Sequence, residues 1–171
     1  NPYEISNASE LQAMEDDLDA NYTLVSDIDA SQTAQFNDGA GFVPVGASFN
    51  PFTGSFDGDN HTVTGLTINR PTENDVGLFG ATGNFSVGAT LSNVTLANVT
   101  VTGDDTVGGF VGQNSGTIRN VTVSGSVTGG GRGGGGGGTK CWGRTHTKAS
   151  PIARGTATGE GFPITARRTT R

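Results

Sequence analysis

Adjacent carboxylates at Asp104 and Asp105 are the first residues of this sequence that could do chemistry. In a glycosidase or lyase built on β-strands, one such group could donate a proton while the other accepts one. The pair stands directly before a glycine-rich turn, which also fits a solvated corner of the fold. We favour the corner and predict that the chain is not an enzyme.

Asp57 and Asp59 form a second acidic pair, whose carboxylates could bind a hard cation such as Ca²⁺. The segment lacks the loop pattern and the distal Glu of an EF-hand, so an Asp-Gly turn between two strands is favoured. The two histidines, His61 and His146, are too few and too far apart for a His-based triad or metal cluster. The sequence therefore predicts no catalytic, cofactor-binding or metal site.

Asparagines that precede x-Ser/Thr occur seven times, and in an exported protein such sequons accept glycans. Three of them have a competing structural role. Asn7 fits a helix cap, while Asn93 and Asn120 occupy equivalent positions of a repeat, where side-chain amides could stack. The glycosylation candidates are therefore the other four: Asn21, Asn60, Asn84 and Asn98.

The elements that position these side chains begin with a short amphipathic helix at about residues 7–18. Asn7 stands three residues before Glu10, as in a capping box, and Leu11, Met14 and Leu18 share one face. We expect this helix to cover an open end of the strand stack that follows.

From Asn21 onward, short β-branched segments alternate with Gly, Asn and Asp, which is typical of strands and turns. Four phenylalanines lie in the first of these segments. We expect them to fill the core: Phe42, Phe49, Phe52 and Phe56.

An internal repeat is the most informative feature of the strand region. HTVTGLTIN from His61, TLSNVTLAN from Thr90 and TIRNVTVSG from Thr117 carry apolar residues at matching positions, 28 and 27 residues apart. Such a period is typical of a solenoid, with Val63, Leu91 and Ile118 stacked on successive coils. A β-sandwich is the competing architecture, but it would not require equal spacing.

The apolar positions within each repeat do not alternate strictly, which indicates a bend. We place it near Gly65, Asn93 and Asn120, because Gly and Asn tolerate positive φ.

Residues 106–129, TVGGFVGQNSGTIRNVTVSGSVTG, resemble the GLUG motif, and DVGLFG at residues 75–80 is similar to a degenerate copy. With the upstream strands, the resemblance covers about residues 3–130. It implies a right-handed parallel β-helix of the kind carried by adhesin-like surface proteins and, as an accessory region, by exported peptidases. Within the motif, Gly108, Gly109 and Gly112 suit close backbone approach, and Phe110 and Val111 begin a buried strand.

Charge divides the chain in two. Residues 1–128 hold 15 of the 16 acidic residues and only Arg70 and Arg119 as basic ones, a net charge of about −13. Nucleic acid is excluded as a partner of this part, since phosphate contacts need a basic surface. Strong acidity without lysine indicates a halophilic protein, although an ordinary acidic exported protein has the same character.

The glycine-rich basic tail, residues 131–171, departs from the repeat and contains the single cysteine, Cys141. We expect it to be disordered and without a packed core, either as a genuine linker or anchor or as the product of a frameshift.

The sequence thus predicts an all-β chain, a right-handed parallel β-helix over residues 1–130 with an N-terminal capping helix. We expect a non-catalytic structural or adhesive module of a secreted or cell-surface protein, with extracellular components such as carbohydrate as partners and no membrane span. The alternative is an accessory region of a larger exported enzyme, a peptidase or a polysaccharide-active β-helix protein.

Overall fold

The computed structural model describes residues 1–84 and 86–130, which form a mostly β fold with short helices. The predictions made for residues 131–171, including a disordered tail, lie outside the described residues. The helices are α1 (Ala8–Gln12), η1 (Ala13–Asp16) and η2 (Ser31–Gly39). The strands are β1 (Tyr3–Ile5), β2 (Asn21–Leu24), β3 (Ile28–Asp29), β4 (Ser55–Asp57), β5 (Thr62–Thr64), β6 (Thr67–Asn69), β7 (Phe79–Thr82), β8 (Thr90–Gly103), β9 (Val111–Asn114) and β10 (Thr117–Gly129).

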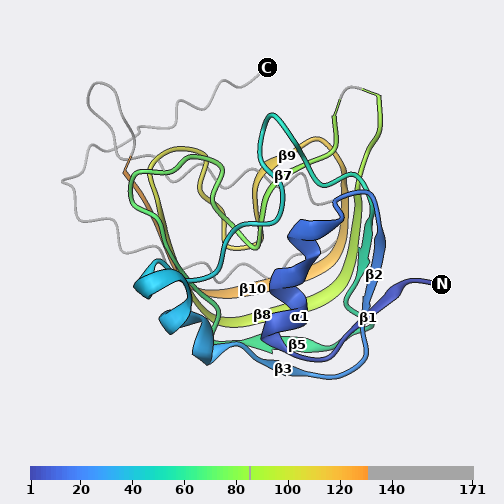
Figure 1. Ribbon diagram of the computed structural model, residues 1–171, viewed down its shortest axis with the longest axis horizontal. Helices are drawn as coiled ribbons and strands as arrows, with labels where there is room; N and C mark the ends of the chain where they lie inside the picture. The colour runs from blue at the N-terminus through green and yellow to red at the C-terminus, as the bar shows by residue number, and fades with distance from the viewer. Residues whose placement is uncertain (85, 131–171) are drawn as a thin grey trace, which may run out of the picture.

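All pairings between these strands are parallel, as predicted. The long strand β8 is the centre of the larger sheet. On one side it pairs successively with β4, β5 and β6, and on the other side it pairs with β10. In Figure 1, β3, β5, β8 and β10 follow one another along the lower edge, while β7 and β9 form a second, two-stranded sheet opposite.

Apolar ladders run through the sheet, but one predicted step is wrong. Leu91 pairs with Ile118 as expected. Val63 pairs with Leu96 and not with Leu91, whose partner on the earlier coil is Phe56. The separation is 35 residues from Phe56 to Leu91 but 27 from Leu91 to Ile118.

Loop length explains the error. Nine residues lead from Thr82 to Leu91, whereas four lead from the equivalent Asn114 to Ile118. The constant period read from the sequence therefore selects a wrong partner where the coil is longer.

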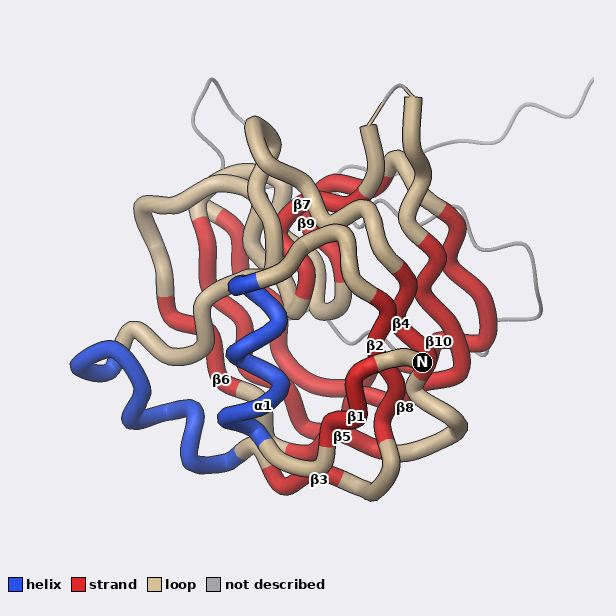
Figure 2. Tube along the Cα trace, turned by 45° about the vertical axis from the view of Figure 1, so that its right-hand side comes forward, coloured by secondary structure: helices blue, strands red, loops and turns tan. Residues whose placement is uncertain are grey.

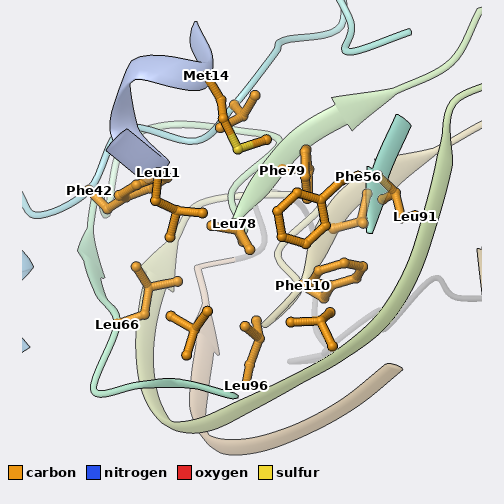
Figure 3. Packing of buried hydrophobic residues seen from close by; sticks show 14 of the residues in the cluster. Leu11, Met14, Phe42, Phe56, Leu66, Leu78, Phe79, Leu91, Leu96 and Phe110 are labelled. Carbon is orange, nitrogen blue, oxygen red and sulfur yellow. The ribbon is translucent and has the colours of Figure 1, made fainter. Parts of the chain in front are cut away.

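Aromatic rings fill the interior between the two sheets. Phe79 lies between Phe52, Phe56 and Phe110, with ring centroids 5.1, 5.4 and 5.5 Å away. Figure 3 shows Phe56, Phe79 and Phe110 grouped closely in this interior. Phe42, Phe52 and Phe56 are fully buried, which confirms three of the four predicted core phenylalanines.

Phe49 is the exception, since 92% of its surface is exposed. It lies in a tight turn in which Ala47 and Asn50 exchange backbone hydrogen bonds of 2.9 Å. Phe49 stands at the tip of this turn with its side chain in solvent, so the prediction that Phe49 belongs to the core is wrong.

The N-terminal helix is confirmed, although it is shorter than expected. The Asn7 side-chain oxygen accepts hydrogen bonds from the backbone N–H groups of Ser9 and Glu10, which starts α1. Leu11 and Met14 are fully buried, and Figure 3 shows both side chains directed inward. In Figures 1 and 2, α1 lies across the interior at the N-terminal end of the strand stack.

The predicted bends are also confirmed. Gly65, Asn93 and Asn120 have φ values of 77°, 55° and 51°. At Gly112 the backbone of β9 approaches another coil so closely that a Cβ would lie 2.7 Å from the carbonyl oxygen of Gly80. Only glycine fits there without a shift of the backbone.

Candidate functional site

Asp104 and Asp105 lie at a corner after β8, where they line a hollow of about 390 Å³. The Asp105 carboxylate accepts a hydrogen bond of 2.9 Å from the N–H of Thr106, and the Asp105 N–H donates to the Asn74 side chain. The residues that line the hollow are Pro71, Thr72, Asn74, Asp104 and Asp105. This geometry matches a turn in which the Asp105 carboxylate holds the backbone.

Asp57 and Asp59 also form a turn. Asp57 Oδ1 accepts the Asp59 N–H at 3.0 Å, and Asp59 and Asn60 both have positive φ. The same Asp57 oxygen accepts a hydrogen bond from Asn93 Nδ2 at 3.0 Å. Over residues 1–84 and 86–130, no three His, Cys, Asp or Glu side chains are grouped so that they could hold a metal ion.

His61 contacts the carboxylate of Asp27 on the preceding coil, with Nδ1 3.1 Å from Oδ1. The backbone N–H of Thr62 donates to the same oxygen at 2.8 Å. These two hydrogen bonds, the one from Thr62 foremost, lower the pKa of Asp27 below its ordinary value. The pair links two coils, and the sequence alone did not indicate it.

Asn93 and Asn120 stack as an amide ladder. Asn120 Nδ2 donates to Asn93 Oδ1 at 2.9 Å, and Asn93 Nδ2 donates to Asp57. The predicted stacking is confirmed, and the structure adds a carboxylate at its first step. Both Nδ2 atoms, to which a glycan would be attached, are hydrogen-bonded to neighbouring coils.

The four glycosylation candidates all have exposed side chains. Asn21 and Asn84 use their side-chain oxygens as acceptors, from Ser55 Oγ and from the N–H groups of Ser86 and Val87. A glycan is attached through Nδ2, so these hydrogen bonds are compatible with modification. Of the other two candidates, Asn60 lies in a turn with φ of 65°, and Asn98 lies within β8 with φ of 54°.

A hollow of about 300 Å³ near the N-terminus was not anticipated. Tyr3 and Tyr22 form one wall, with ring centroids 5.6 Å apart. The Tyr22 hydroxyl donates to the Asp17 carbonyl at 2.8 Å, and burial raises the pKa of the Tyr22 phenol. Most of the remaining lining residues are acidic, Asp16 among them. Tyr3 lies opposite Tyr22 because β1 pairs with β2. The sequence would have indicated this pair only if the three-residue strand β1 at the N-terminus had been recognised.

Parallel strands joined by apolar and amide ladders define a repeat domain, and residues 103–128 match the GLUG motif. The chain therefore carries a GLUG-motif repeat region, as its resemblance implied.

Two relatives extend the similarity beyond the motif. The chain is 44% identical over 146 residues to halomucin of Haloquadratum walsbyi, an alignment that covers 81% of the chain and 2% of the relative. It is 39% identical over 127 residues to a putative Gly-rich membrane protein of Evansella cellulosilytica, covering 72% of the chain and 14% of the relative. The chain thus spans a small part of the curated relatives that it matches.

No solved structure shows significant similarity to the chain. Among the described residues, none of the helices has both the length and the apolar character needed to cross a bilayer.

Proposed function

We propose that this chain is a non-catalytic structural and adhesive module of an exported surface protein, folded as a right-handed parallel β-helix. The observation that carries the proposal is the set of parallel, in-register ladders in a segment 44% identical to a stretch of halomucin. A stack of coils provides a long, stiff surface without requiring a cleft. Of the best candidates for catalysis, Asp104 and Asp105, the second supports the non-catalytic assignment because its carboxylate and its N–H hold a turn.

Localisation provides the first test. An antibody raised against residues 1–130 should label intact cells of the source organism or detect the protein in its medium. Signal that appears only after the cells are lysed would contradict an extracellular or cell-surface position.

Adhesion provides the second test. The proposed partners are extracellular components, carbohydrate among them, and purified full-length chain should be retained on immobilised extracellular polysaccharide without shortening it. The alternative, an accessory region of an exported peptidase or polysaccharide-active enzyme, is tested in the same assay. Turnover abolished by Asp104→Asn or Asp105→Asn would overturn the non-catalytic assignment.

Glycans are proposed at Asn21, Asn60, Asn84 and Asn98, whose exposed side chains support this modification. Peptide mass spectrometry of protein from the source organism should find hexose-bearing peptides at these sites and unmodified Asn93 and Asn120. Glycans on Asn93 would contradict both the proposal and the amide ladder.

A further inference from the structure

The two ends of the strand stack differ. At the N-terminal end, α1 covers the interior, and Leu11 is fully buried. At the other end lies β10, which pairs only with β8 among the described strands. Val94 and Val101 on β8 are 2% and 1% exposed, whereas their β10 partners, Val121 and Val127, are only half-buried. The ladders therefore continue to the outer edge of β10, where no strand or helix of the described residues covers them.

The amide ladder at this edge has a fixed direction. Asp57 carries a carboxylate, which offers only acceptors, so Asn93 must turn its Nδ2 toward Asp57. That orientation leaves Asn93 Oδ1 as the acceptor for Asn120 Nδ2. Because Asn120 donates through Nδ2, the Oδ1 on the other arm of the same amide is the group left for a strand beyond β10, and it accepts no hydrogen bond from the described residues. The last exposed group of the ladder is thus an acceptor, and the side-chain amides could not be exchanged without placing two oxygens together.

We infer that the outer edge of β10 docks one further parallel strand of the same repeat, and that this strand must present an amide N–H donor opposite Asn120. This inference rests on the proposed role as a module of a repeat array. The docked strand would extend the register already seen between β8 and β10, with apolar side chains over Ile118, Val121 and Val123. Backbone pairing would supply affinity, and the donor would select the register.

Other occupants fit less well. Residues 131–171 contain no Asn, so they cannot supply the side-chain amide that continues the ladder. A second copy paired edge to edge about a two-fold axis would run antiparallel to β10 and would bring a second acceptor instead of a donor. The N-terminal strand β1 of a second copy has three residues, against the thirteen of β10. Another GLUG-type coil offers both the length and the donor.

The experiment adds that coil to the full chain. A copy of residues 104–129 is inserted after Gly129, with Asn, or Asp in a matched variant, at the position that corresponds to Asn120. Hydrogen exchange is then measured on the original β10. With Asn in the inserted coil, the outward amides of β10 should exchange about tenfold more slowly than in the parent chain, the effect of gaining a hydrogen bond. With Asp, protection should be several-fold smaller, because two acceptors would face each other.

A second background separates ladder direction from simple charge repulsion. Asp57→Asn removes the group that fixes the direction, so the ladder can reverse and turn Asn120 Nδ2 outward. The preference for Asn over Asp in the inserted coil should then largely disappear. Unchanged β10 exchange with the Asn coil would overturn the docking surface. Equal discrimination in both backgrounds would overturn the donor requirement, and neither result would depend on surface localisation or adhesion.

Discussion

The ring of Phe79 on β7 meets the ring of Phe56 on β4 edge-on, with the centroids 5.4 Å apart and the planes at 68°. This contact joins the smaller sheet to the larger one across the interior. Because Phe79 also touches Phe52 and Phe110, one side chain connects successive coils. The packing of these four phenylalanine rings therefore stabilises the contact between the two sheets.

Phe79→Ala should lower the free energy of unfolding by about 3–5 kcal/mol, the range for removing a buried aromatic side chain. Urea or guanidinium unfolding followed by circular dichroism measures the change. Phe49→Ala is the matched control, since Phe49 is 92% exposed and its loss should leave the midpoint nearly unchanged. Equal effects of the two substitutions would mean that the rings around Phe79 do not hold the sheets together.

Val94→Asp should unfold the repeat region, because it places a charge in an apolar ladder with no partner for it. Val94 is 2% exposed and pairs with Val121. The control is Thr122→Asp, which places the same charge on an exposed position of β10. Thermal melting should show a lost or strongly lowered transition for the first variant only, whereas a normal transition would mean that Val94 faces solvent.

Stability should rise with salt. The described part of the chain carries nearly all of the 16 acidic residues, and their mutual repulsion opposes the compact state. The Debye length falls from about 10 Å at 0.1 M salt to about 3 Å at 1 M, so the melting temperature should increase over this range of NaCl. Replacing exposed acids by amides, in Glu4→Gln, Asp38→Asn and Asp59→Asn together, should reduce the increase. A melting temperature independent of salt in the parent chain would remove the argument for a halophilic protein.

Asp27 should contribute to acid sensitivity. Its pKa is lowered in the folded state by hydrogen bonds from Thr62 and His61, so the unfolded chain takes up the proton first as the pH falls. The stability contributed by this carboxylate is therefore present above its ordinary pKa, about 4, and is lost as the pH falls through the lower folded value. Asp27→Asn should flatten the dependence of the urea midpoint on pH below about pH 4. A curve parallel to that of the parent chain would show that these hydrogen bonds do not favour the carboxylate.

Local patterns determined much of this protein from the sequence. Asn7 caps the helix through the N–H groups of Ser9 and Glu10, which are two and three residues away, and the helix begins there. The spacing from Leu91 to Ile118 and from Asn93 to Asn120 is one short coil, so both the apolar pair and the amide pair were predicted. These features depend on neighbouring residues or on a constant period.

Tertiary structure decided the remainder, because it depends on the path of the chain between strands. Longer loops before β8 shift the partner of Val63 from Leu91 to Leu96. The turn at Ala47 and Asn50 exposes Phe49, although phenylalanine is a residue type that is usually buried. The number of loop residues sets the register between strands of successive coils. Because loop residues carry no periodic apolar pattern, this register cannot be read from the sequence. The register in turn decides which side chains meet across coils.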